Sequence, residues 1–296
     1  MLIAKIPRPY FMDEHPNPMH TIPSTAIDEL IERYDALLFD AYGVLVHRDG
    51  PLPGACELLA RLRSLGKPFY LVTNSAARLP EHAAQRYRCF GLAIEPEQII
   101  SSGGLLKPYF AGNGLQGSRC AILGPEDTFH FVSQAGGLAV PPFEDFDVLV
   151  IGDQVGFPFL ESMDAVLSRL ISKFDRGESP LLILPNPDLI YPKARGFGIT
   201  CGAMALVIET VLKQRYPGRT DIRFVHLGKP ETALFEEAAR RACTRNLVMI
   251  GDQMDTDILG ACRFGIDSAL VSGGVAELAF HSRQQDRWPT YQLTGL

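Results

Sequence analysis

Short apolar runs that end in polar residues set the strongest constraint on the fold of this chain. One run, Ala36 to Phe39, is apolar at every position and is followed at once by Asp40. The run from Pro68 to Val72 repeats this form, and between the two lies a helical spacing of leucines that ends at Gly66. Strands that are apolar on both faces and alternate with helices are typical of a parallel sheet covered on both sides. We therefore expect an α/β fold that binds ligands beyond the carboxyl ends of its strands.

Two later segments have the same form and are separated from the first pair by a long insertion. Phe224 to Leu227 leads into Gly228-Lys229-Pro230, and Leu247 to Ile250 leads into Gly251-Asp252. The residues between the two pairs carry enough strands and helices for a second domain. We predict an N-terminal arm at residues 1–23, a core domain formed by 24–112 and 220–296, and an inserted domain at 113–219.

Composition and charge exclude several classes of protein. The 296 residues are 46% hydrophobic and 21% charged, which is typical of a globular protein. A net charge of −6 gives no basic field for nucleic acid or an anionic membrane. The six cysteines form no CxxC pattern, and we find no export signal and no apolar stretch of membrane-spanning length. We therefore expect a cytoplasmic protein with neither nucleic acid nor membrane as a partner.

The strand ends of the first pair carry side chains suited to phosphate chemistry. Asp40 ends the first run and precedes Tyr42 and Gly43 in a turn. A carboxylate placed there can be a nucleophile or a metal ligand, although an aspartate also commonly caps a turn. Thr73-Asn74-Ser75 follows the second run, where its donors suit a phosphate oxygen or simply cap the next helix. Both interpretations stay open at each position.

The strand ends of the later pair supply a lysine and a group of acids. Lys229 directly precedes Pro230, and a single lysine is most often just solvated. Asp252, Asp255 and Asp257 follow the fourth run within six residues. Acids so close repel one another unless a cation or hydrogen bonds compensate, so the alternative is a solvated acidic turn. Mg²⁺ fits because it prefers oxygen ligands and accepts water and phosphate as the remaining ones.

Taken together in chain order, the four clusters resemble the motifs of the haloacid dehalogenase (HAD) superfamily. The resemblance implies that Asp40 is the nucleophile of the first motif and Thr73 the hydroxyl of the second. Lys229 then corresponds to the lysine of the third motif, and Asp252 with Asp257 to the acids of the fourth.

The insertion makes the resemblance more specific. Leu184-Pro185-Asn186-Pro187-Asp188 and Gly202-Ala203-Met204-Ala205 look like the Asn-Pro-Asp loop and the small-residue helix start of the large α/β cap, the C2 type, in the NagD-like (type IIA) phosphatases. The implied architecture is a Rossmann-like parallel-sheet HAD core with an inserted α/β cap domain. This similarity covers roughly residues 34–280.

The resemblance also implies an activity, which is hydrolysis of a small phosphate monoester, of a sugar or polyol kind, through an aspartyl-phosphate. Mg²⁺ would be held by Asp40, the Tyr42 carbonyl and Asp252, with Asp257 in support. Lys229 would neutralise charge on the nucleophile and the phosphoryl group.

The implied substrate-binding residues come from both domains. Thr73 and the N–H of Asn74 would bind the non-transferred oxygens, and Gly43 and Ser75 lie in the same two loops. Asn186 and Asp188 are the cap residues expected to face the site. Cap closure would exclude water and select a small phosphorylated metabolite, and pairing through the cap would give a homodimer.

One position departs from the family pattern and keeps two alternatives open. The hydrolases normally carry a second aspartate two residues after the nucleophile, as acid and base, and here that residue is Tyr42. Its loss typically costs about 10²- to 10⁴-fold in rate. With tyrosine at this position, the segment resembles the Asp-x-Tyr-Gly motif of the 2-haloacid dehalogenases, whose halide leaving group needs no proton. Those enzymes, however, lack the acidic fourth motif. The other alternative is a catalytically weak protein that binds a phosphorylated metabolite.

Overall fold

The computed structural model describes residues 22–47, 50–193, 196–271 and 288–296. Within them, the larger sheet has seven strands in the order β1-β16-β15-β14-β2-β5-β6, and every neighbouring pair is parallel. Its strands are β1 (Ser24–Thr25), β2 (Ala36–Phe39), β5 (Phe69–Thr73), β6 (Ile99–Ser101), β14 (Leu247–Gly251), β15 (Asp267–Val271) and β16 (Tyr291–Leu293). The predicted parallel sheet is therefore confirmed.

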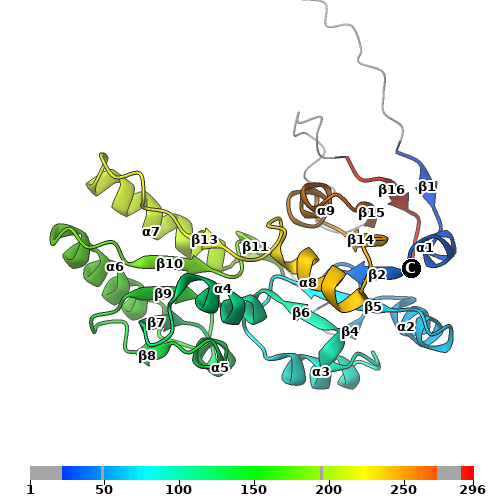
Figure 1. The fold of residues 1–296 in the computed structure, drawn as a ribbon, viewed down its shortest axis with the longest axis horizontal. Coiled ribbons are helices and arrows are strands. Elements are labelled where there is room, and N and C mark those ends of the chain that lie inside the picture. The colour runs from blue at the N-terminus through cyan, green and yellow to red at the C-terminus, as the bar shows by residue number, and fades with distance from the viewer. Residues whose placement is uncertain (1–21, 48–49, 194–195, 272–287) are drawn as a thin grey trace, which may run out of the picture.

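A second parallel sheet is inserted between β6 and β14. Its order is β13-β10-β9-β7-β8, with β7 (Arg119–Leu123), β8 (Leu138–Val140), β9 (Val148–Ile151), β10 (Leu181–Leu184) and β13 (Val225–His226). Figure 1 shows the two sheets side by side, with β11 (Ile190–Pro192) and α8 (Ala233–Ala242) between them. The expected α/β core with an inserted α/β cap is confirmed.

One predicted strand lies in the other sheet. We expected Phe224 to Leu227 to be a core strand, but only Val225 and His226 form a strand, and Val225 pairs with Ile183 of β10 in the cap sheet. An apolar run indicates that a strand is buried, but it does not indicate which sheet the strand joins. We keep the division into arm, core and cap as a proposal. In the revised division, the boundary at which the chain passes from the cap back to the core lies after β13 rather than at residue 220. Most of the predicted arm, residues 1–21, lies outside the described residues.

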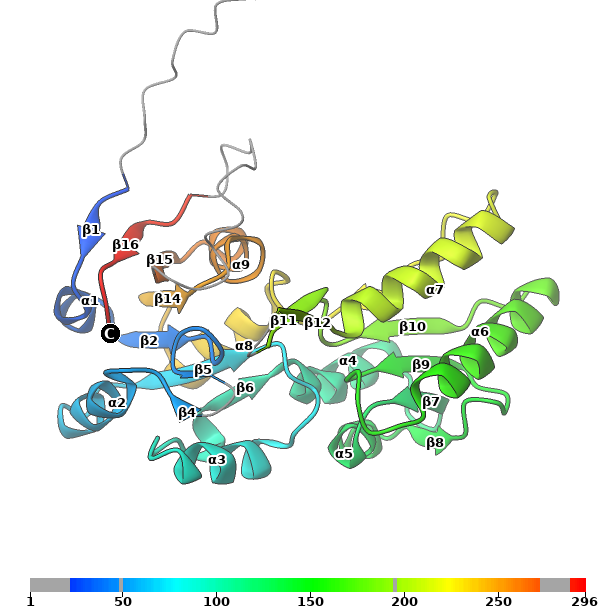
Figure 2. The same ribbon diagram turned by 180° about the vertical axis from the view of Figure 1, so that it is seen from behind.

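Helices cover both sheets on both faces (Figures 1 and 2). In addition to α8 they are α1 (Ile27–Arg33), α2 (Ala55–Ser64), α3 (Pro80–Cys89), α4 (Leu106–Asn113), α5 (Glu126–Gln134), α6 (Phe159–Asp175), α7 (Cys201–Arg215) and α9 (Leu259–Phe264). Short helical turns occupy η1 (Pro96–Gln98), η2 (Ser102–Leu105) and η3 (Met254–Ile258), and hairpins join β3 (Val46–His47) to β4 (Gly50–Pro51) and β11 to β12 (Phe197–Ile199). None of the described helices is long and apolar enough to cross a membrane.

Strand β2 shows why the core sheet requires helices on both faces. Leu37 and Phe39 lie in an apolar cluster with residues of α1, α2 and α3. Ala36 and Leu38 lie in a second cluster, with residues of α8 and α9. Alternate side chains of a strand point to opposite faces of the sheet. All four side chains are fully buried because helices cover both faces. The polar residue that follows, Asp40, is thereby fixed at the carboxyl edge of the sheet.

The second cluster also joins the core to the cap. It contains Phe110 of α4 and Leu38 of β2, together with Ile122 of β7 and Val150 of β9 from the cap sheet. The opposite face of the cap sheet packs against α6 and α7 in a cluster of its own. The core and cap therefore share one apolar interior, which limits how far this face of the cap can move from the core.

We expect Phe110→Ala to lower the free energy of unfolding by about 3–5 kcal/mol, because it empties a fully buried ring site in the shared cluster. Urea denaturation measures the loss. Phe143→Ala is the matched control, since that ring is 64% exposed and its removal is expected to cost within about 0.5 kcal/mol. Equal losses in the two variants would contradict the shared interior.

Candidate active site

Neighbouring strands bring three of the four predicted motifs together. Asp40 follows β2, Thr73 ends β5, and Asp252 follows β14, and these strands are adjacent in the order β14-β2-β5. Because the three strands are parallel, their carboxyl ends meet at one edge of the sheet. Lys229 reaches the same edge from the segment between β13 and α8.

The Lys229 ammonium group lies at the centre of this edge. It donates hydrogen bonds to Asp40 Oδ1 at 2.7 Å, to Asp257 Oδ1 at 2.6 Å and to the Val72 carbonyl at 2.9 Å. The lysine side chain is only 2% exposed, and Asp257 is completely buried. A solvated lysine, the ordinary expectation for a single residue of this type, is thus excluded here.

Three carboxylates surround a space suited to a cation. Asp40, Asp252 and Asp257 each offer an oxygen, and these three oxygens lie within 4.8 Å of one another. With all groups ionised, three carboxylates and one ammonium leave a net charge of −2, which a buried cluster does not tolerate without compensation. A hard divalent cation that takes oxygen ligands, such as Mg²⁺, fits this donor set.

Burial and the neighbouring charges both shift the pKa values of Asp257 and Lys229. Burial raises the pKa of Asp257 to about 8; the Lys229 charge lowers it and the Asp40 and Asp252 charges raise it. Burial by itself lowers the pKa of Lys229, but the charges of Asp257 and Asp40 outweigh it and raise that pKa overall. The lysine therefore stays charged, and a bound cation would favour ionised Asp257.

Gly43 allows the turn after β2 to approach the acidic cluster. Its φ of +84° is in the left-handed region, and a Cβ built there would lie 2.2 Å from Asp252 Oδ2. The turn is held by hydrogen bonds from Gly43 N–H to the Val46 carbonyl and from Leu45 N–H to the Ala41 carbonyl, both at 3.0 Å. A residue expected to bind substrate is thus placed directly against a predicted metal ligand.

Asn74 connects the core site to the cap. Its Oδ1 accepts the Lys229 backbone N–H at 2.6 Å, and its Nδ2 donates to the Lys229 carbonyl at 3.0 Å and to Asp188 Oδ1 at 3.1 Å. The Asn74 side chain is therefore used to hold Lys229 and the cap loop. Only its backbone N–H is left for the predicted contact with phosphate.

The cap loop after β10 is held by its own turn and by α7. Asn186 Oδ1 accepts the Asp188 N–H at 3.0 Å, while the Asp188 carbonyl accepts the Thr200 hydroxyl at 2.5 Å and the Gly202 N–H at 2.9 Å. A Cβ at Gly202 would lie 2.2 Å from the Pro187 carbonyl, so the small residue is required by this close approach. Of the two predicted cap residues, Asp188 contacts the core, whereas the described bond of the Asn186 side chain is within the loop.

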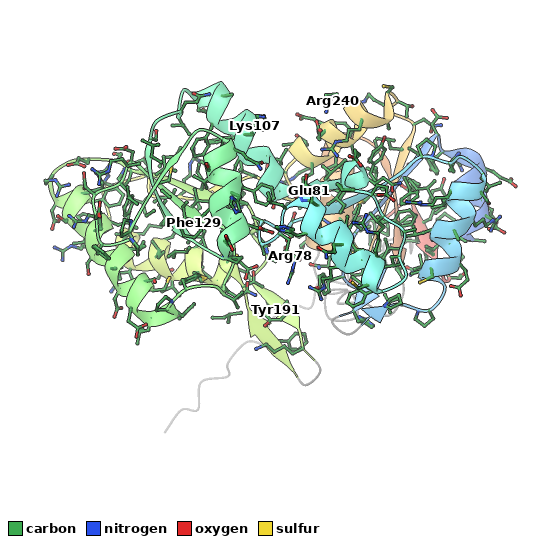
Figure 3. The ribbon with its side chains drawn as sticks, turned by 90° about the horizontal axis from the view of Figure 1, so that it is seen from below. Arg78, Glu81, Lys107, Phe129, Tyr191 and Arg240 are labelled. Carbon is green, nitrogen blue, oxygen red and sulfur yellow. The ribbon has the colours of Figure 1, made fainter. Side chains whose placement is uncertain are left out.

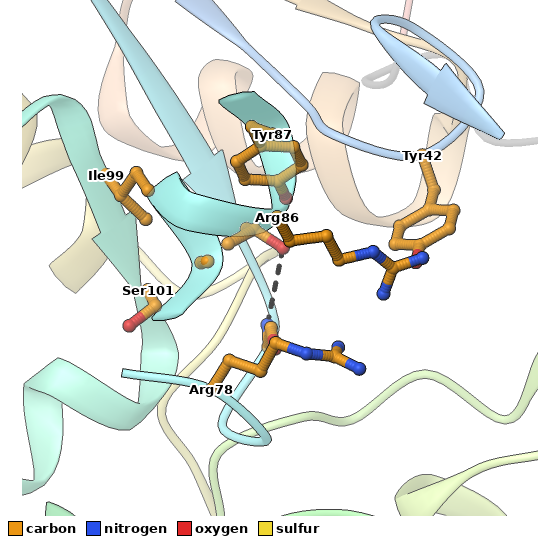
Figure 4. A pocket seen from close by; sticks show the side chains of 9 residues that line it. Tyr42, Arg78, Arg86, Tyr87, Ile99 and Ser101 are labelled. Atoms are coloured by element: carbon orange, nitrogen blue, oxygen red, sulfur yellow. Dashed lines mark hydrogen bonds between the residues drawn. The ribbon is translucent and has the colours of Figure 1, made fainter. Parts of the chain in front are cut away.

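A small pocket borders the site on the side of α3. Its lining includes Tyr42, Thr73 and Ser75, together with Arg78 and Arg86. Figure 4 shows the Arg86 guanidinium beside the Tyr42 ring, which is 42% exposed. In Figure 3, Arg78 lies between α3 and α5, where core and cap meet. Neither arginine was among the predicted site residues. Arg78 could have been predicted, because it lies in the same loop as Thr73, between β5 and α3.

Comparison with known proteins identifies the family. Residues 37–137 match the model of the haloacid dehalogenase-like hydrolases, and residues 226–296 match a second model, HAD-hydrolase-like. A possible sugar phosphatase of the HAD superfamily from Cytophaga hutchinsonii superposes with a TM-score of 0.79 at 30% identity, covering 93% of this chain and 98% of that one. The chain belongs to the HAD superfamily.

Two further relatives are phosphatases. An acid sugar phosphatase of Staphylococcus aureus is 26% identical over 268 residues, which is 90% of this chain and 96% of the relative. A glycerol phosphate phosphatase from Mycobacterium tuberculosis, solved with calcium, has a TM-score of 0.75 at 28% identity and covers 90% of this chain and 74% of that one. The predicted identity, a NagD-like HAD hydrolase of the phosphatase type, is confirmed.

We expect Gly43→Ala to destabilise the protein more than Gly66→Ala does. Both glycines have positive φ, and forcing an alanine into such a conformation costs about 1–2 kcal/mol. Nothing lies within 4 Å of a Cβ at Gly66, whereas one at Gly43 collides with Asp252. Urea denaturation measures the free energy of unfolding of both variants, and the difference between them reports the collision with Asp252. Equal losses of unfolding free energy would contradict the close approach of Gly43 to Asp252.

Proposed function

We propose that this protein is a magnesium-dependent phosphatase that hydrolyses a small sugar or polyol phosphate through an aspartyl-phosphate on Asp40. The observation that carries the proposal is the position of Asp40, held by Lys229 in a cluster of three carboxylates at the edge of the sheet. The activities of two relatives, an acid sugar phosphatase and a glycerol phosphate phosphatase, support this class of substrate. A related structure with magnesium supports the choice of metal.

In the first step, an Asp40 carboxylate oxygen forms a bond to phosphorus and the ester P–O bond breaks. The bonding pair leaves with the alkoxide, which must take up a proton. In the second step, water attacks phosphorus, the bond to Asp40 breaks, and the carboxylate is regenerated with release of inorganic phosphate. Splitting one displacement into two lowers each barrier.

The surrounding residues orient and neutralise charge during both steps. Lys229 holds the nucleophilic carboxylate and offsets negative charge on it. The Thr73 hydroxyl and the Asn74 N–H would bind the non-transferred oxygens, with Ser75 beside them. Asp40, Asp252, Asp257 and the Tyr42 carbonyl would hold Mg²⁺, which supplies electrostatic stabilisation of the phosphoryl oxygens.

The acidic cluster favours phosphoryl transfer over the two alternatives. Displacement of a halide by aspartate needs no metal, so a dehalogenase would have no use for three buried carboxylates beside one another. A protein that only binds a phosphorylated metabolite would not need a carboxylate held ready by a buried lysine.

We also propose a cytoplasmic location and pairing of two copies through the cap. The cap exposes apolar side chains on α7 and on β12, namely Leu206, Val207, Phe197 and Ile199. Exposed apolar residues of this kind are typical of an interface.

The test is hydrolysis of 4-nitrophenyl phosphate by the wild type and by Asp40→Asn, each with magnesium and with chelator. An aryl leaving group departs with little need of a proton, so the assay is sensitive to the nucleophile. We expect turnover that requires both magnesium and Asp40. Asp255→Asn, which changes an exposed acid of the same motif, is the control and should keep near wild-type turnover. Turnover by Asp40→Asn, or by the wild type in chelator, would overturn the proposal.

A further inference from the structure

The site, as proposed, lacks the carboxyl group that the family has two residues after the nucleophile as acid and base. Tyr42 stands at that position, and its ring lies beside Arg86 on the side of α3 (Figure 4). A phenol is a much weaker acid than a carboxyl group and is poorly suited to the base half of that task. An alkoxide leaving from a sugar or polyol nevertheless requires a proton. A carboxyl group elsewhere in the site would supply that proton, and accept one in the second step, more readily than the phenol.

The cap provides a carboxylate next to the phosphate-binding loop. Asp188 Oδ1 accepts a hydrogen bond from Asn74 Nδ2 at 3.1 Å, and the same nitrogen donates to the Lys229 carbonyl at 3.0 Å. Lys229 in turn contacts Asp40 at 2.7 Å. Two residues, Asn74 and Lys229, thus connect Asp188 to the nucleophile. The backbone bonds to Thr200 and Gly202 fix the loop that carries Asp188.

The direction of approach also suits proton transfer. Asp40 lies at the end of the core strand β2, whereas Asp188 reaches the site from the end of the cap strand β10. In an in-line displacement the leaving oxygen lies opposite the attacking one, and so on the side of the cap. A cap carboxylate is therefore on the side where the alkoxide departs.

We propose that Asp188 is the general acid and base of this phosphatase, an inference that rests on the proposed function. Asp188 gives its proton to the leaving alkoxide oxygen while Asp40 bonds to phosphorus. The Asp188 carboxylate then takes a proton from the water that attacks the aspartyl-phosphate, which returns the enzyme to its starting protonation state. Asp188 takes on the task that the family assigns to the residue at position 42.

The ionisation of Asp188 is compatible with both roles. Burial raises the pKa of Asp188 to about 6; the Asn74 hydrogen bond and the Lys229 charge lower it, and the Asp40 charge raises it. Burial raises the pKa of the Cys201 thiol at the start of α7, and the charges of Asp153 and of Asp188 also act on this thiol and raise its pKa further. A general acid and base works best with a pKa near the operating pH. We therefore expect kcat/KM for an alkyl phosphate to fall as the pH rises above about 6.

The experiment compares glycerol 1-phosphate with 4-nitrophenyl phosphate in the wild type, Asp188→Asn and the double variant Asp188→Asn/Tyr42→Asp. We expect Asp188→Asn to lower kcat for the alkyl ester by about 10²- to 10⁴-fold and to change kcat for the aryl ester by less than about tenfold. The aryl reaction also shows that the variant is folded. Asp188→Asn should remove the fall above pH 6, and Tyr42→Asp should restore alkyl turnover by placing a carboxyl group at the family position.

Asp153→Asn is the matched control, because Asp153 is another half-buried cap acid whose pKa burial raises. It should leave the ratio of alkyl to aryl turnover unchanged. An equal loss on both esters in Asp188→Asn, an unchanged alkyl rate, or a double variant no faster than Asp188→Asn would overturn the assignment. Absence of Asp40-dependent turnover on both esters in the wild type would instead count against the proposed function.

Discussion

The buried contact of Lys229 with Asp40 and Asp257 is the interaction on which the site depends. An ammonium group that is 2% exposed would lose its proton without partners, and three clustered carboxylates would repel one another without a cation. Removing one member of such a cluster leaves an uncompensated charge in a buried place, which typically costs about 3–5 kcal/mol. The cluster therefore ties together segments that lie far apart in the sequence, and the fold and the chemistry depend on the same contacts.

The same lysine also links the core to the cap. Its backbone N–H and carbonyl are both bonded to the Asn74 side chain, which in turn holds Asp188. Next to this link, the Thr128 hydroxyl of α5 donates to the Ala76 carbonyl at 2.9 Å, in the loop that follows Thr73. Together with the apolar cluster shared by the two sheets, these bonds position the cap loop over the strand ends. A change in the cap can thereby alter groups around the nucleophile.

The sequence predicts those features that follow from periodicity and from side chains at strand ends. The runs at 36–39, 68–72 and 247–250 specify buried parallel strands, and their polar ends specify the location of Asp40, Thr73 and Asp252. Local pattern does not specify partners, so the strand at Val225–His226 was assigned to the wrong sheet. The contact of Gly43 with Asp252 and the bond of Asn74 to Asp188 are likewise beyond such reasoning, because both join residues more than a hundred positions apart.

Direct detection of the covalent intermediate tests the central claim most directly. The reaction with 4-nitrophenyl phosphate and magnesium would be quenched within the first turnover, reduced with borohydride, and digested for mass spectrometry. An aspartyl-phosphate on Asp40 predicts conversion of residue 40 to homoserine, in an amount that follows the burst of nitrophenol. A burst with residue 40 unmodified and another residue reduced would contradict Asp40 as the nucleophile.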